Sequence, residues 1–139
     1  MSLSAPHAIP SLLEKLFALR GVQPFDRLSP DELTLVAEVA RPRTYAPGEI
    51  MHLGDAPLSR LLVVTEGSVR DPAGHATGAI TGVASLLNDT IVPVLRADAA
   101  AGARVLSISR HHFFTLAREC PEFVLGLIEL GAEGAPAAP

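Results

Sequence analysis

The stretch from Thr77 to Ala99, "TGAITGVASLLNDTIVPVLRADA", has the form of an anion-binding turn. Two glycines four residues apart, Gly78 and Gly82, precede small residues suited to opening a helical turn. The first N–H groups of a helix point at a ligand and favour negative charge. Yet Asp89 is the only charged residue between Gly78 and Arg96. The stretch therefore predicts the backbone of an anion site without the cation and carboxylate that would complete it.

Histidines are the next candidates for chemistry, as metal ligands. The candidate ligands are His52, His75, His111 and His112. A His-rich centre in a β-barrel needs two ligands one residue apart on a strand, and the sequence contains no H-x-H. We interpret these residues as ordinary surface or rim histidines and predict no metal site.

Two further side chains carry reactive groups. Ser85 follows Gly-Val-Ala, which lacks the G-x-S-x-G spacing of a nucleophile elbow, so we expect it to cap the turn. Cys120 is the single cysteine, which excludes an internal disulfide and fits a reducing compartment, hence a cytoplasmic location. We expect it to pack between the last two helices. No acid–base or nucleophile constellation is present, so we predict that the chain is not an enzyme.

Composition limits the function classes. The 139 residues are 48% apolar and 19% charged, which is the balance of one globular domain. The net charge of −4 gives no electrostatic case for nucleic acid. The longest apolar runs are too short to span a bilayer. With 11 glycines and 12 prolines, the chain must turn often and its strands must be short.

The elements that position the turn fall into three zones. Helices are predicted over residues 10–21, with a stripe of Leu12, Leu13, Leu16, Phe17 and Leu19, and over 29–42. The second has a capping box, with Ser29 at the N-cap and Glu32 at N3. Residues 43–109 read as short strands, one of which, "RLLVVTEG", is apolar enough to be buried on both faces. Helices return after Ser109 and after Pro121, where Phe123, Val124, Leu127, Ile128 and Leu130 make the last helix apolar nearly all round.

These motifs resemble those of the cyclic nucleotide-binding domains found in catabolite activators and cyclic-nucleotide-gated channels. The matching segments are "PFDRLSPDEL", "YAPGE", Gly54-Asp55 and the buried strand ending in "EGSV". The resemblance implies a mainly β domain with flanking helices: an antiparallel β-barrel of the jelly-roll, double-stranded β-helix type over residues 10–131. We expect residues 1–9 to be disordered or vector-derived and residues 132–139 to be a flexible tail or linker stub.

In the family, the phosphate-binding cassette supplies a Glu to the ribose and an Arg to the cyclic phosphate. The glycines, the small residues and the two leucines of that cassette pattern match Gly78, Gly82, Ala84, Ser85, Leu86 and Leu87. Val83 stands at the Glu position, and a loop one residue short puts Ile91 or Val92 at the Arg position. Arg96 aligns with a family position that faces outward.

The resemblance implies a regulatory domain whose binding of cAMP or cGMP is very weak or absent, and we predict no other cofactor. Two alternatives remain: an interaction or dimerisation module of a larger protein, and a sensor of a more apolar ligand in a pocket lined by Val83, Ile91 and Val92. The family's equivalent of the last helix often dimerises or covers the ligand, so we expect this helix to fold back on the barrel or to form a homodimer. No DNA-reading helix-turn-helix follows Leu130, so we expect no nucleic acid partner for this chain alone.

Overall fold

The computed structural model describes residues 11–134, with side chains to residue 129. The predicted leader at 1–9 and the side chain of Leu130 lie outside the described residues. So does most of the predicted tail at 132–139, although the last helix runs to Gly134.

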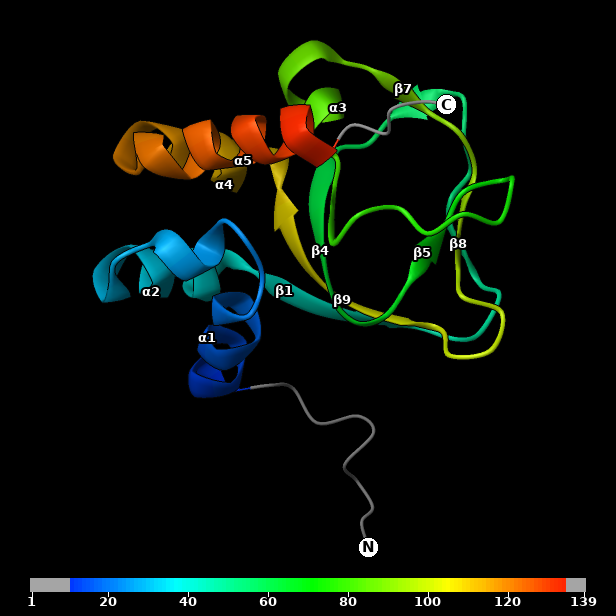
Figure 1. Cartoon of the computed structure of the whole chain (residues 1–139), viewed down its shortest axis with the longest axis horizontal. Coiled ribbons are helices and arrows are strands. Elements are labelled where there is room, and N and C mark those ends of the chain that lie inside the picture. The colour runs from blue at the N-terminus through cyan, green and yellow to red at the C-terminus, as the bar shows by residue number, and fades with distance from the viewer. Residues whose placement is uncertain (1–10, 135–139) are drawn as a thin grey trace, which may run out of the picture.

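The elements follow the predicted order of helices, strands and helices (Figure 1). The first helical group consists of α1 (Leu12–Arg20), the 3₁₀ turn η2 (Phe25–Arg27) and α2 (Pro30–Val39). The strands are β1 (Arg41–Tyr45), β2 (Ile50–His52), β3 (Ala56–Pro57), β4 (Arg60–Gly67), β5 (Val69–Arg70), β6 (Ile80–Thr81), β7 (Ile91–Val92), β8 (Leu95–Ala97) and β9 (Ala103–Ser109). Helix α3 (Val83–Asn88) lies between β6 and β7, and α4 (Arg110–Glu119) and α5 (Pro121–Gly134) follow β9.

Local hydrogen bonds explain where the helices begin. Ser29 Oγ accepts from the Glu32 amide at 3.2 Å, and Glu32 Oε1 accepts from the Ser29 amide at 3.0 Å, which confirms the predicted capping box. Ser109 caps α4 with its side chain alone, since its Oγ accepts from the His112 amide. Each cap satisfies amide groups that the first turn of a helix leaves without partners.

Helix α1 differs from its prediction in how much of its apolar stripe is covered. Leu19 is buried and Leu16 is half-buried, but Leu13 is 61% exposed and Phe17 is 67% exposed. The helix packs on α2 and η2 through a narrow stripe, so the wider face predicted from the sequence points to solvent.

The described strands pair antiparallel throughout and form three sheets. Their orders are β1-β9-β4-β6, β2-β8-β5 and β3-β7. These antiparallel sheets with flanking helices confirm the predicted fold class, although the pairings do not close into one continuous barrel. Within the part of the chain described, no helix is both long and apolar enough to cross a membrane.

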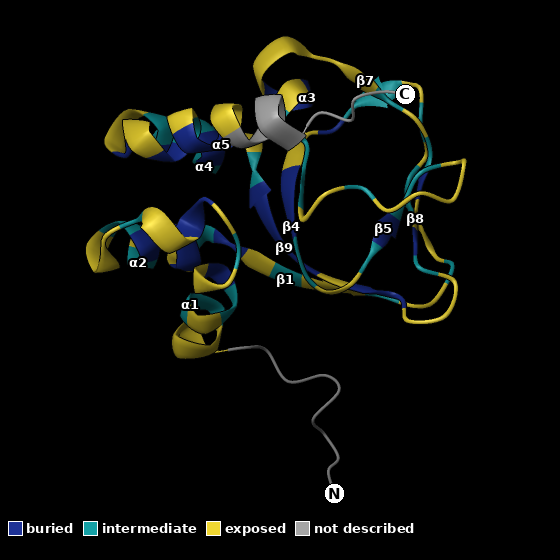
Figure 2. Ribbon diagram, in the orientation of Figure 1, coloured by how far each residue is buried: buried dark blue, intermediate teal, exposed yellow. Residues whose placement is uncertain are grey.

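Two apolar cores share strands β4 and β9. On β4, Leu61 and Val63 face the helices while Leu62 faces the other sheets, because successive side chains point to opposite faces. Val105 and Leu106 of β9 divide in the same way. This confirms the prediction that "RLLVVTEG" is buried on both faces; the buried parts of both strands are dark blue in Figure 2.

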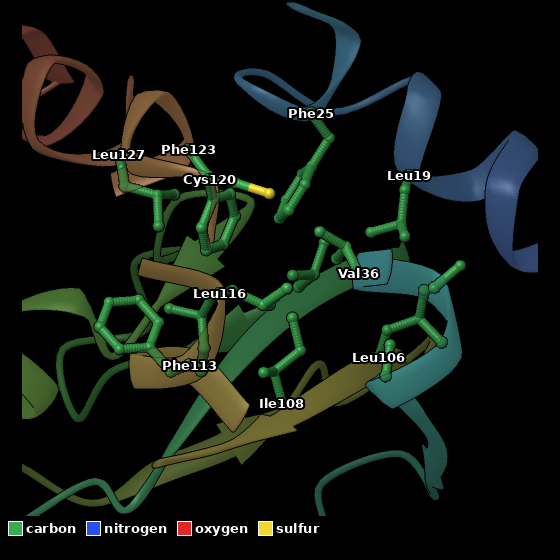
Figure 3. Packing of buried hydrophobic residues seen from close by; sticks show 14 of the residues in the cluster. Leu19, Phe25, Val36, Leu106, Ile108, Phe113, Leu116, Cys120, Phe123 and Leu127 are labelled. Atoms are coloured by element: carbon green, nitrogen blue, oxygen red, sulfur yellow. The ribbon is translucent and has the colours of Figure 1, made fainter. Parts of the chain in front are cut away.

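The helical core rests on aromatic packing (Figure 3). The ring of Phe123 lies 5.4 Å from that of Phe25 and 6.2 Å from that of Phe113. Cys120 is buried in the same cluster, between α4 and α5, as predicted. Helix α5 therefore folds back onto the domain, which is one of the two arrangements that the sequence predicted.

Candidate ligand-binding turn

Gly82 sets the geometry of the predicted turn. Gly82 is the N-cap of α3, and its φ of 114° lies in the left-handed region. No side chain caps this helix. A Cβ added at Gly82 would lie 2.6 Å from the Arg60 carbonyl oxygen. Only glycine fits this conformation and this close approach, and the chain enters a helix here, where the sequence predicted a helical turn. Gly78, four residues earlier, is exposed and lies just before β6.

The first residues of α3 leave no carboxylate at the turn. Val83 is half-buried and packs against the helical core, while Ala84 is exposed. Leu86, one helical turn after Gly82, is 1% exposed and anchors α3 in the same core. The position expected to bind a ribose hydroxyl is thus an apolar side chain committed to packing.

Ser85 does not cap the turn, so the prediction for this residue was wrong. The side chain is 1% exposed, and its Oγ donates to the Thr90 carbonyl oxygen at 2.7 Å. The hydroxyl closes the loop after α3 because a residue at the third position of a short helix points back into the core. This bond links α3 to the residue directly before β7.

Strand β7 presents no cation at the turn. Ile91 is 64% exposed, whereas Val92 is half-buried and packs in the second core. The strand pairs with β3, in the register Ala56 to Val92 and Pro57 to Ile91. The pairing stops before Pro93, which lacks the N–H that a continued ladder needs.

The arginines nearest the turn in the sequence point away from it. Arg96 lies between Leu95 and Ala97, which are each 2% exposed and face the inside, so Arg96 faces outward as expected. Its Nη1 donates to the Gly48 carbonyl oxygen at 3.2 Å. At the other end of α3, Arg110 forms an ion pair of 3.7 Å with Asp89.

No other reactive centre emerges in the described residues. No group of three His, Cys, Asp or Glu side chains there could hold a metal ion. Burial raises the pKa of the Cys120 thiol, and the nearby carboxylates of Glu32 and Glu119 raise that pKa further. A thiol with a raised pKa is a poor nucleophile near neutral pH.

One polar cluster, centred on Asp98, was not predicted from the sequence. Asp98 Oδ2 accepts from the amides of Ala100 and Ala101, at 3.0 and 2.8 Å, and Asp98 Oδ1 pairs with Arg70 Nη2 at 3.0 Å. The backbone bonds, and then Arg70, hold the pKa of the Asp98 carboxyl below its usual range. An Asp directly before "AAAG" is a local turn signal that could have predicted the backbone half of this cluster.

Comparisons with known proteins identify the fold. No family model matches the chain, and no curated protein matches it. Among solved structures, the regulatory domain of Toxoplasma gondii protein kinase A with cAMP aligns with a TM-score of 0.69 and 18% identity, covering 88% of this chain and 49% of that one. The regulatory subunit of a cAMP-independent protein kinase A from Trypanosoma cruzi, bound to guanosine, aligns at 0.66 and 19%, over 88% and 48%. The Thermus thermophilus catabolite activator protein aligns at 0.64 and 24%, over 78% and 56%.

The chain therefore has the fold of the cyclic nucleotide-binding domains, as its motifs implied. Those structures are regulatory domains or regulators, and the chain spans about half of the length of each. At these identities the likeness defines the fold, and the ligand has to be argued from this chain's own residues.

Proposed function

We propose that this chain is a regulatory, non-enzymatic domain of the cyclic nucleotide-binding type that does not respond to cAMP or cGMP at ordinary concentrations. One observation carries the proposal. The glycine turn before α3 is intact, but Val83 and Val92 pack into the two cores and Ile91 is the exposed residue of β7. The polar contacts that a cyclic nucleotide requires have been replaced by apolar packing.

The expected loss of affinity is large. A hydrogen bond to a charged group contributes about 1.5–3 kcal/mol, which is about tenfold to a hundredfold in affinity. Two such contacts are missing, and a phosphate placed against Ile and Val side chains would keep unpaired anionic oxygens. Both effects weaken binding of a cyclic phosphate.

A ligand without a phosphate is the first alternative, and the chemistry of the turn favours it over a cyclic nucleotide. The Trypanosoma cruzi regulatory subunit is described as cAMP-independent and bound to guanosine, a nucleoside that needs no phosphate cation. An uncharged ligand would tolerate Val83, Ile91 and Val92. The domain would then sense a more apolar small molecule.

An interaction module within a larger protein is the second alternative. Leu125 and Ile128 on α5 are 58% and 47% exposed, and α1 exposes Leu13 and Phe17. Apolar side chains at the surface mark candidate contact sites for a partner domain or a second copy. On either reading we propose a cytoplasmic protein acting through protein partners or small ligands and not through nucleic acid.

Calorimetric titration with cAMP, cGMP and guanosine tests the proposal. We expect no heat signal from wild type with either cyclic nucleotide at sub-millimolar concentrations. The double variant Val83→Glu with Ile91→Arg restores the carboxylate and the cation, and we expect at least about a tenfold gain in cAMP affinity. The control Val83→Glu with Val92→Arg tests the register of the loop. Because Val92 packs in a core, we expect this control to be less stable.

Each outcome distinguishes between the candidate functions. Tight cAMP binding by wild type would refute the proposal. A gain in the Ile91→Arg variant supports a sensor domain with an altered turn. No gain in either folded variant, together with no guanosine signal, would favour the interaction module.

A further inference from the structure

A second surface with ligand-binding chemistry lies on the outer face of the β2-β8-β5 sheet, away from the α3 turn. Ile50, Arg96 and Arg70 occupy one row across the three strands, in paired register. Beside this row lies an open hollow of about 640 Å³, whose lining includes Arg70, Pro72, Val94, Arg96, Asp98 and Ala99. Small-molecule sites have volumes of about 300–1,000 Å³, so the hollow has room for a small ligand.

The two arginines in the row are directly opposite each other, an arrangement that repels. Arg70 is compensated: its Nη2 and Nε lie 3.0 and 3.1 Å from Asp98 Oδ1, and its Nη1 donates to the Gly74 carbonyl oxygen at 3.1 Å. Asp98 is therefore occupied by Arg70 and by the amides of its own turn.

Arg96 has no such compensation. Its Nη1 donates to the neutral Gly48 carbonyl, and no carboxylate pairs with it in the part of the chain that the structure describes. The other carboxylate of the lining, Asp71, accepts from the amides of Ala73 and His75 in its own turn. Nε and Nη2 of Arg96 form none of the described hydrogen bonds, so the hollow has one guanidinium available to an anion.

We propose that this hollow binds a small organic carboxylate with a compact apolar body. The carboxylate would pair with Arg96, whose planar fork matches two oxygens. The apolar body would rest on Pro72, Val94 and Ala99. A monoanion fits better than a dianion, because only one positive charge is unpaired and Asp71 and Asp98 lie in the same lining.

Amide chemical-shift titration of the whole chain with three probes tests the proposal. Benzoate has both the negative charge and the apolar body. Acetate has the negative charge without the apolar body, and benzamide has the apolar body without the charge. We expect benzoate to shift amides around residues 48, 70–74 and 94–99 with a dissociation constant on the order of 1 mM, and the other two probes to bind at least about tenfold more weakly.

Arg96→Gln should abolish the advantage of benzoate over benzamide in a domain that still folds, because the side chain is exposed. Arg118→Gln makes the same charge change on α4 and should leave benzoate binding as in wild type. The proposal is overturned if benzoate leaves the hollow's amides unshifted, if benzamide binds as well as benzoate, or if Arg118→Gln weakens benzoate as much as Arg96→Gln does. Since the probes and variants do not involve α3 or β7, failure here is distinguishable from failure of the proposed function.

Discussion

Gly82 is the residue on which the path of the chain into α3 depends. Its left-handed φ is one reason for glycine, and the 2.6 Å that would separate an added Cβ from the Arg60 carbonyl oxygen is a second. Gly74 has a similar φ of 87° but no atom within 4 Å of such a Cβ. A comparison of the two positions therefore separates the cost of a left-handed backbone, which both share, from the cost of a steric clash, which arises only at Gly82.

We predict that Gly82→Ala lowers the free energy of unfolding more than Gly74→Ala does. The left-handed backbone alone costs about 1–2 kcal/mol for a residue with a Cβ, and the clash should add at least about 1 kcal/mol at Gly82. Urea denaturation of both variants beside wild type measures the difference. Equal losses would show that the carbonyl of Arg60 moves away at little cost.

Asp98 is the other residue whose role can be isolated. Its carboxylate joins the turn before β9 to Arg70 of β5, and its pKa is lowered first by the backbone bonds and then by Arg70. A carboxyl whose folded pKa lies below its unfolded pKa stabilises the fold above the unfolded pKa, about 3.9. That stabilisation is lost as the pH falls through the folded pKa.

We therefore predict that Asp98→Asn lowers the melting temperature at pH 7 and that the difference from wild type shrinks as the pH falls below about 4. Thermal unfolding followed by circular dichroism at several pH values measures both effects. Asp26→Asn, at an exposed position of η2, is the control and should leave the melting temperature unchanged throughout. A difference at Asp98 that stays constant down to about pH 2 would contradict the role of the ionised carboxylate.

At the scale of elements, what the sequence predicts well is what depends on neighbours in the chain. The cap at Ser29 involves a residue three positions away, so residue types alone predicted it. The break between β7 and β8 follows from Pro93 in the same way. Strand β4 was predictable because burial on both faces requires a continuous apolar run.

Features that depend on packing between distant elements were harder to predict from the sequence. Ser85 reads as a cap from its neighbours, yet its hydroxyl bonds to Thr90 because α3 is only six residues long and its core side faces the following loop. The exposure of Phe17 depends on how little of α1 is covered by α2. For the candidate site, the sequence predicted the glycine at the start of α3, whereas the packing of Val83 and Val92 into different cores required the structure.

At the scale of the whole molecule, the sheets form one end and the helices the other, with β4 and β9 between them (Figure 1). The glycine and proline positions predicted short strands, and the resemblance of the motifs to the cyclic nucleotide-binding family implied this particular fold. They carry no information on assembly, which depends on the surface that the helices leave uncovered. The chain also spans only about half of the length of the solved structures that share its fold.

Helix α5 is the element through which we expect the domain to associate. Its buried side, Phe123 and Leu127, is already used within the domain, and its outer side leaves Leu125 and Ile128 exposed. Helix α3, which packs against α5, also exposes an apolar side chain, Leu87. Burying this outer side against a second copy would remove apolar area from water, which contributes about 25 cal/mol per Å².

We therefore predict that wild type is a dimer by sedimentation velocity at concentrations of tens of micromolar, and that Leu125→Glu with Ile128→Glu is a monomer with an unchanged fold. Leu13→Glu with Phe17→Glu makes the matched change on the exposed face of α1, where both side chains are at least as exposed, and should leave the dimer intact. Added negative charge alone cannot explain a difference between the two variants, because both replace two exposed apolar side chains with two carboxylates. Loss of the dimer in the α1 variant alone would move the interface to α1, and a monomeric wild type would exclude self-association through α5.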